Sequence, residues 1–335
     1  MSTLYVTEQG ARVEREYAHL IVEVEDEVRI RLPLDRISAL VLVGRVSVTT
    51  PALHALLQRR AGVALLDRSG RLLGRLTPPV SGRRAVRAAQ YQRAEDKAFC
   101  VAMARSIAAG KLHNQRALAM RLVRLESGEA EALPAQLLQR LADAEARLPT
   151  ATDLASVRGI EGSASRAYFT ILRSALQPGI PFGERSRRPP RDPVNAMLSL
   201  GYTLLAHGCL TACESTGLDP YAGFYHSDRT GRPSLALDLM EEFRSVIVDS
   251  VVLGLVNREM VTARHFEPGP AGGVYLTHDG MRIFLLRYSA RLQTSVRAAG
   301  VDHPLTYQKL FEVQARRLRK AIEGASENYQ PFCTR

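Results

Sequence analysis

The chain has 335 residues, 46% of them hydrophobic and 24% charged, so it can bury a sizeable core, and wholesale disorder is excluded. A formal net charge of +11 favours an anionic partner. The first residues lack an export signal, the longest apolar stretch is broken by Asp249, and four cysteines form no Cys-x-x-Cys pair. We therefore expect a cytoplasmic protein of about two domains, without a membrane span or a disulfide framework.

Short β-branched runs predict that the first 80 residues are mostly strands. One helix is predicted over 51–60, where apolar residues recur at helical spacing and Pro51 suits a first turn. Residues 1–80 are therefore predicted to form a small N-terminal β-sheet domain, with strands at 4–6, 20–24, 28–32, 39–43, 63–66 and 71–76.

From Pro78 and Pro79 onward, long stretches of Ala, Leu, Arg and Glu lack strand alternation. They predict a larger all-α domain over 81–335, and hence an α+β fold. A loop over 177–192 is rich in Pro and Gly, and its second half carries Arg185, Arg187, Arg188 and Arg191. The predicted helices lie near 85–109, 112–126, 134–147, 163–176, 193–213, 235–260, 280–298 and 304–324.

The predicted helix over 235–260 places an acid on its apolar face. At 100° per residue, Glu241 lines up with Leu237 and Val248, so its carboxylate faces the interior and needs a partner. Asp238 lies one turn earlier, and two acids at this spacing can point at a single cation. A salt bridge to an arginine is the structural alternative.

The loop before this helix delivers His226, and Ser234 is expected to cap the helix. A neutral imidazole beside carboxylates makes a mixed nitrogen and oxygen site, which suits Mn²⁺ or Mg²⁺ more than Zn²⁺ when no cysteine is near. A purely structural histidine is the alternative. The candidate metal ligands on this side are therefore His226 and Glu241, with Asp238 in reserve.

A third acid, Glu161, stands between Gly159 and Gly162 near a predicted helix start. Glycines on both sides let backbone or substrate approach closely. An N-terminal acid stabilised by the helix macrodipole is the alternative interpretation.

A basic run on the last long helix, with Arg316, Arg317 and Arg319, predicts phosphate contacts, and a solvated helix face is the alternative. The sequence contains no Walker loop, dinucleotide fingerprint or nucleophile elbow. Nucleotide-driven and acyl-transfer chemistry therefore lack sequence support.

Taken together, these segments resemble the CRISPR-associated adaptation endonuclease family, the integrase subunit that inserts new spacers. The run Glu161-Gly-Ser-Ala-Ser-Arg166-Ala-Tyr168-Phe169 is similar to the first acidic motif of the family. The stretch from His226 to Asp249 is similar to its second and third motifs combined. The opening residues 2–7 and the ending 329–332 further resemble members from subtype I-C systems.

The resemblance implies that Glu161, His226 and Glu241 coordinate Mg²⁺ or Mn²⁺ at the catalytic site. Arg166 and Arg232 are candidates for holding the scissile phosphate, because arginine pairs with phosphate in a bidentate way. Structural pairing with Asp228 or Glu242 is the alternative for both. The arginines of the 185–191 loop and of the last helix would follow the DNA backbone.

The resemblance also implies partners. It predicts a homodimer made through residues 1–80, and a small ferredoxin-like adaptation protein that joins two such dimers in a hetero-hexamer. Double-stranded DNA, both the incoming fragment and the CRISPR repeat, would lie across the assembly. Two other functions fit the charge of the chain: a stand-alone, structure-selective DNA nuclease of repair, and a non-catalytic architectural DNA-binding protein.

Overall fold

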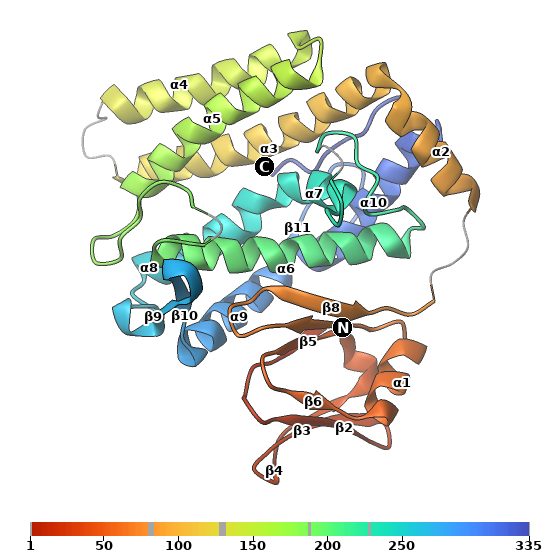
Figure 1. Ribbon diagram of the computed structural model, residues 1–335. Coiled ribbons are helices and arrows are strands. Elements are labelled where there is room, and N and C mark those ends of the chain that lie inside the picture. The colour runs from red at the N-terminus through yellow and green to blue at the C-terminus, as the bar shows by residue number, and fades with distance from the viewer. Residues whose placement is uncertain (1, 80–83, 127–131, 187–188, 227–228, 335) are drawn as a thin grey trace. The chain divides into compact units, whose positions relative to one another are not determined.

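The computed structural model describes residues 2–79, 84–126, 132–186, 189–226 and 229–334, which form both sheets and helices (Figure 1). The N-terminal β-sheet region and the helical C-terminal part confirm the predicted α+β class. The chain divides into two compact units. The first contains residues 1–80, 186–203 and 261–290, and the second contains 81–185, 204–260 and 291–335.

Two four-stranded sheets dominate the first unit. One has the order β1-β5-β7-β8, in which β1, β5 and β7 are parallel and β8 is antiparallel. The other has the order β4-β3-β2-β6. The strands are β1 Ser2–Val6, β2 Arg12–Glu16, β3 His19–Val24, β4 Glu27–Pro33, β5 Ile37–Val43, β6 Ser47–Val48, β7 Gly62–Leu66 and β8 Leu72–Leu76.

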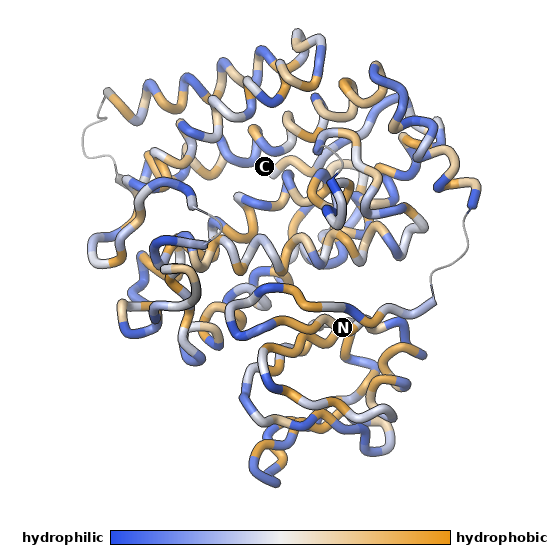
Figure 2. Tube along the Cα trace, viewed as in Figure 1, coloured by the Kyte–Doolittle hydropathy of each residue, from blue (hydrophilic) through white to orange (hydrophobic). Residues whose placement is uncertain are grey.

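The core of these N-terminal residues lies between the strands and helix α1, Thr50–Gln58. Leu20, Leu40 and Leu56 are fully buried in one apolar cluster. Figure 2 shows hydrophobic residues recurring along the strands, the pattern expected of strands with a buried face. Sequence analysis missed β2, whose apolar content is only Val13 among charged neighbours.

Helices make up most of the second unit. Helices α3, α4 and α5 pack against one another and lie side by side in Figure 1. The helices of the whole chain after α1 are α2 Arg84–Glu95, α3 Lys97–Glu126, α4 Ala132–Arg147, α5 Leu154–Ser174, α6 Pro193–Ser215, α7 Ser234–Met240, α8 Ser250–Asn257, α9 His278–Leu292 and α10 Tyr307–Ile322.

Helix α5 begins at Leu154, nine residues before the predicted start at 163. Asp153 provides the physical reason, because its carboxylate accepts the backbone N–H of Ser156 at 2.7 Å and thereby caps the helix. Glu161 consequently lies in the third turn of α5. The interpretation of Glu161 as an acid at a helix N-terminus is therefore wrong.

The helix predicted over 235–260 is continuous in direction but irregular in hydrogen bonding. Helix α7 is followed by a 3₁₀ turn, Glu241–Phe243, then by a π-helical turn, Arg244–Asp249, and then by α8. The carbonyl oxygen of Val246 in the π turn accepts a hydrogen bond from Arg291 Nε at 2.7 Å. The predicted cap by Ser234 is also wrong, because Pro233 occupies that position and no side chain caps α7.

Two short hairpins complete the described structure. Strands β9, Phe266–Gly269, and β10, Gly273–Leu276, pair where sequence analysis expected an exposed connection. Strands β11, Ser295–Val296, and β12, Leu305–Thr306, pair before α10. Single 3₁₀ turns cover Leu34–Arg36, Leu148–Thr150, Ala263–His265 and Pro270–Gly272.

Among the described residues, α6 alone is long and apolar enough to cross a membrane by length and composition. The most apolar part of this helix is 61% buried inside the protein. Burial of that kind is typical of a core helix of a globular protein.

Candidate active site

Three segments of the second unit bring Glu161, His226 and Glu241 to one place. Glu161 extends from α5, His226 ends the described part of the loop that follows α6, and Glu241 begins the 3₁₀ turn after α7. His226 Nε2 lies 3.5 Å from Glu241 Oε1. The link to Glu161 runs through a fourth residue, Lys111, from α3.

Lys111 Nζ contacts both glutamates. It forms an ion pair with Glu161 Oε1 and lies 2.7 Å from Glu241 Oε2. The Lys111 side chain is only 10% exposed, and those of Glu161 and Glu241 are 17% and 2% exposed. The two carboxylates therefore converge on one point charge that is largely shielded from water.

Electrostatics keep Glu241 ionised despite its burial. Desolvation alone raises the pKa of this carboxyl, but the charges of Arg244, Lys111 and His226 outweigh it and lower the pKa to about 2. Arg244 Nη2 lies 2.9 Å from Glu241 Oε1. The arginine salt bridge that was the structural alternative thus exists, but it shares Glu241 with a lysine and a histidine.

Asp238 holds His226 rather than a cation. Asp238 Oδ1 lies 2.7 Å from His226 Nδ1 and accepts the backbone N–H of the same residue at 2.9 Å. Its Oδ2 accepts the N–H groups of Phe224 and Tyr225. Because an ionised carboxylate only accepts, we assign the imidazole proton to Nδ1, which leaves the Nε2 lone pair directed toward Glu241.

Glu161 is approached from an open side. Ser165 Oγ donates to Glu161 Oε1 at 2.8 Å, and the Tyr225 hydroxyl lies 3.5 Å from Oε2. A methyl group built on Gly159 or Gly162 would meet no atom within 4 Å. The α5 surface on both sides of Glu161 is therefore free for a bulky group to approach.

A buried polar network supports the neighbouring Glu242. Its carboxylate accepts the backbone N–H of Phe332 at 2.7 Å and the hydroxyl of Tyr329 at 3.0 Å. Burial raises the pKa of Glu242 to about 8, although these donors lower it. Adjacent glutamates thus have opposite environments: Glu241 is held as an anion among cations, and Glu242 is enclosed by residues 329–332.

The same segment also fixes α3 close to Lys111. Asn114 Nδ2 donates to the carbonyl oxygens of Glu242 and Phe332 at 2.7 and 2.8 Å. Gly110 leaves room for Pro331, since an added Cβ would lie 2.5 Å from the Pro331 ring. Residues 329–334, which we call the C-terminal strap, therefore tie α3 to the turn that carries Glu241.

The donor set of this site fits a divalent cation. Two carboxylates and an imidazole are ligands that Mg²⁺ or Mn²⁺ accepts, and Glu241 Oε2 is buried without a hydrogen-bond partner. Within the described residues, no three His, Cys, Asp or Glu side chains are grouped as a metal cluster as they stand. Lys111 contacts both glutamates, so a cation bound by these two acids has to displace its ammonium group.

Comparison with known proteins agrees with this arrangement of motifs. The family described as CRISPR associated protein Cas1 matches residues 4–290. The chain belongs to this family. The CRISPR-associated endonuclease Cas1 1 of Chlorobaculum tepidum is 36% identical over 100% of this chain and 99% of that protein.

Solved Cas1-related structures share the fold. A chain of a structure titled Cas6-RT-Cas1--Cas2 complex has a TM-score of 0.81 and 27% identity, and the match covers 99% of this chain and 36% of that one. A casposase bound to integration product has a TM-score of 0.85 at 24% identity, over 98% of this chain and 93% of that one. The second likeness shows the fold alone.

The arginines predicted to bind DNA in this Cas1 family member lie in different settings. Arg166 is exposed on α5, Arg232 is half-buried, and Arg191 is exposed after the 177–190 segment. Arg185 is half-buried, and Arg187 and Arg188 lie outside the described residues. Glu242, the suggested structural partner of Arg166 and Arg232, accepts hydrogen bonds from the C-terminal strap, and Asp228 lies outside the described residues.

On α10 the predicted phosphate-binding residues have partners within the protein. Arg316 pairs with Glu312, and Arg319 makes two contacts with Glu323. Arg317 donates to Ala299 O and to Gln314 Oε1. Contact of this helix with DNA stays a prediction, and it would require exchange of these partners for phosphate.

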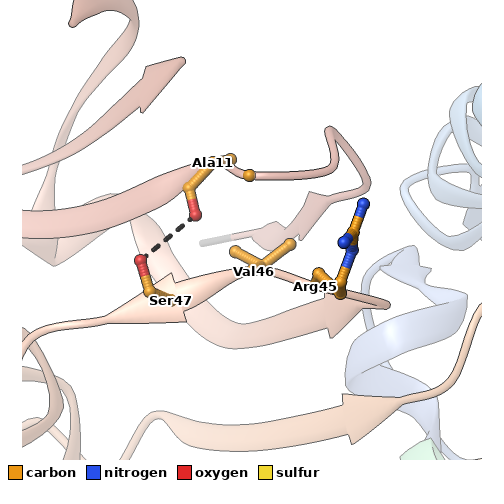
Figure 3. Close-up of a pocket in the computed structure, with 5 residues that line it drawn as sticks. Ala11, Arg45, Val46 and Ser47 are labelled. Atoms are coloured by element: carbon orange, nitrogen blue, oxygen red, sulfur yellow. Dashed lines mark hydrogen bonds between the residues drawn. The ribbon is translucent and has the colours of Figure 1, made fainter. Parts of the chain in front are cut away.

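A shallow hollow of about 310 Å³ occurs among the N-terminal strands of this Cas1 family member (Figure 3). Gly10, Ala11, Arg45, Val46 and Ser47 line it, and Ser47 Oγ donates to Ala11 O. Its lining contains no acid, histidine or cysteine. This hollow therefore offers no catalytic group.

Sequence analysis of this Cas1 family member missed Lys111, Arg244 and Tyr225 as parts of the site. Lys111 gave one usable signal, because it is one of only four lysines in the chain, whereas the other 41 of the 45 cations are arginine (45 − 4 = 41). Arg244 lies three residues after Glu241, the spacing of an intrahelical ion pair. Tyr225 gave no signal beyond its position next to His226.

Proposed function

We propose that this chain is a divalent-metal-dependent DNA endonuclease and integrase that inserts short DNA fragments into a CRISPR array. The observation that carries the proposal is the convergence of Glu161, His226 and Glu241 from three separate segments, with Lys111 against both acids. Membership of the Cas1 family and the endonuclease names of its relatives support the reaction class.

In this proposal Glu161, His226 and Glu241 hold Mg²⁺ or Mn²⁺. When bound, such an ion polarises a phosphodiester and stabilises the charges on the attacking and leaving oxygens. His226 contributes Nε2, because Asp238 engages Nδ1. Asp238, once a reserve ligand, is instead a positioning residue, since both of its oxygens already accept hydrogen bonds.

The protein's own residues would then orient the nucleic acid. The open α5 surface at Gly159 and Gly162 leaves room for a DNA backbone next to Glu161. Arg166 and Arg232 are the proposed phosphate holders. If water attacks the phosphodiester, the strand is hydrolysed; if a DNA 3′-hydroxyl attacks, the strand is transferred. One site serves both reactions, because only the attacking oxygen differs.

The partners follow from the same proposal. The titles of the related structures name a Cas1–Cas2 complex and an integration product, which supports DNA and a small ferredoxin-like adaptation protein as partners. We further propose a homodimer through residues 1–80, a hetero-hexamer with the small protein, and a cytoplasmic location. The ending 329–332 supports an origin in a subtype I-C system.

Strand transfer is the reaction that tests the function. The purified protein is incubated with the small partner, a supercoiled plasmid that bears the repeat, a short labelled duplex and Mn²⁺. We expect the label to be joined to the plasmid, and the joining to disappear with Glu161→Ala or with a chelator. Glu312→Gln serves as the control, because it removes an exposed acid of α10 and should leave joining unchanged.

Other outcomes separate the alternatives. Nicking of the plasmid without joining of label would favour a stand-alone repair nuclease. Binding of DNA without any reaction would favour an architectural protein. Joining that persists in chelator would contradict the metal mechanism, and activity retained in Glu161→Ala would remove Glu161 from the ligand set.

A further inference from the structure

Lys111 occupies an unusual place for a basic residue in a protein with an anionic substrate. It lies in the middle of α3, its side chain is 10% exposed, and its ammonium contacts two carboxylates from two other segments. A lysine that contacted phosphate would instead be expected to extend into solvent. Lys111 is therefore directed at the acids of the site.

The charges around Glu241 show what Lys111 contributes. Arg244 pairs with Oε1 of Glu241, whereas Lys111 pairs with Oε2 and also with Oε1 of Glu161. Lys111 is thus the cation that contacts both glutamates. Two anions this shielded from water repel each other strongly unless a positive charge stands between them.

Lysine also suits this position by its shape. The chain uses arginine for 41 of its 45 cations, yet a lysine stands here. An ammonium group is a compact point charge on a flexible stem, while a guanidinium is a planar fork. A compact charge can neutralise two carboxylates at once and can withdraw along its stem when another cation arrives.

We propose that Lys111 is an internal competitor of the divalent metal, which neutralises Glu161 and Glu241 and has to be displaced when the metal binds. The inference rests on the proposed function, since the metal is the one proposed there. Lys111 thereby lowers metal affinity and keeps the acidic site folded when no metal is bound. In this role it is a positioning residue, and its effect is measured on metal binding rather than on turnover.

Direct measurement of Mn²⁺ binding to the full-length protein tests this role, by calorimetry or by loss of the free-ion paramagnetic resonance signal. Lys111→Met should bind Mn²⁺ about tenfold or more tightly than wild type, because the carboxylates lose their competing ion pairs. Lys111→Arg keeps the charge and should bind no more tightly than wild type. Glu161→Gln should bind more weakly than all of these.

Lys97→Met is the matched control. Lys97 is the exposed first residue of the same helix, about 21 Å along α3 from Lys111 at 1.5 Å per residue. The change removes the same charge from the protein without touching the site. Its Mn²⁺ affinity should equal that of wild type, which separates local competition from a general change in net charge.

Thermal unfolding gives an independent readout and covers a variant that folds poorly. In chelator, Lys111→Met and Lys111→Gln should melt at lower temperature than wild type, and Mn²⁺ should raise their melting temperatures by more than it raises that of wild type. Failure of both variants to fold in saturating Mn²⁺ would overturn the inference, because a metal that replaces the ammonium should restore the site.

The binding data also separate this inference from the proposed function. Equal or weaker Mn²⁺ binding by Lys111→Met, beside wild-type binding that is lost in Glu161→Gln, would overturn the competitor role and leave the metal site standing. Absence of Mn²⁺ binding in every protein tested would overturn the metal site itself, and the inference with it.

Discussion

At the scale of single residues, Asp238 shows how a buried acid can act through another side chain. It accepts hydrogen bonds from three backbone N–H groups and from His226 Nδ1, so its charge is fully used within the loop and helix that it joins. Outer carboxylates of this kind fix the tautomer and the ring orientation of a ligating histidine. Asp238 and His226 therefore behave as one unit.

Asp238→Asn should lower Mn²⁺-dependent plasmid nicking by about 10- to 100-fold, which is less than the complete loss expected for His226→Ala. The amide no longer holds the proton at His226 Nδ1, so Nε2 becomes a poorer ligand. Rates measured over a range of Mn²⁺ concentrations should show that excess metal partly restores activity. Asp249→Asn is the control, since Asp249 is equally buried but pairs with Tyr168. Equal losses in the two variants would contradict a role through His226.

Part of the site was predictable residue by residue. The burial of Glu241 follows from its place on the apolar stripe of a helix, and the structure confirms it at 2% exposure. The contact with Lys111 was not predictable, because helical periodicity says which face is buried but not which residue lies opposite, here on a helix more than a hundred residues earlier. Tertiary packing alone brings the two together.

At the scale of elements, α5 carries Glu161 and depends on its cap. The hydrogen bonds from the backbone and side chain of Ser156 lower the pKa of Asp153 below its ordinary value of 3.8. Because the folded protein lowers this pKa, the cap stabilises the protein fully above the unfolded value. The stabilisation is lost as the pH falls through the lower folded value.

Asp153→Ala should lower the melting temperature by about 1–4 °C at pH 7. The difference from wild type should shrink in melts at pH 4 and pH 3, as the wild-type carboxylate becomes protonated. Asp153→Asn, which keeps an oxygen acceptor, should melt close to wild type at pH 7. A deficit in Asp153→Ala that is independent of pH would show that the charge of Asp153 does not contribute.

Long periodic elements were easier to predict than irregular ones. The helices over α3, α4 and α10 follow from apolar spacing, although the predicted break near 110 in α3 is absent because Gly110 is tolerated inside the helix. The turn types between α7 and α8 could not be predicted, since the hydrophobic pattern of an α-helix continues across them. The β9–β10 hairpin was missed because Pro and Gly obscure the strand signal.

At the scale of the whole molecule, positive charge should govern DNA binding. The formal net charge is +11, and binding to a duplex releases counterions for each phosphate that is neutralised. The open question for α10 is whether Arg316 and Arg319, paired with Glu312 and Glu323, exchange these glutamates for phosphates. Salt dependence answers it directly.

Replacing Arg316, Arg317 and Arg319 together with Gln should weaken duplex binding equally for all sequences. Each lost phosphate contact should reduce the slope of log K against log salt by about 0.9, so three contacts give about 2.7. Glu312→Gln should act in the opposite direction, because it frees Arg316. An unchanged slope in the triple variant would show that α10 does not face DNA.

The C-terminal strap also has a consequence for synthesis on the ribosome. Phe332, whose N–H binds Glu242, is made 90 residues after it, and Thr334 is made 220 residues after its partner Asn114. At 5–20 residues per second, Glu242 waits roughly 5–20 seconds for its donors. A nascent chain stopped at residue 328 already contains Glu161, His226 and Glu241, yet it lacks the strap that encloses the adjoining carboxyl. Translation order therefore makes the assembly of the acidic site a late event.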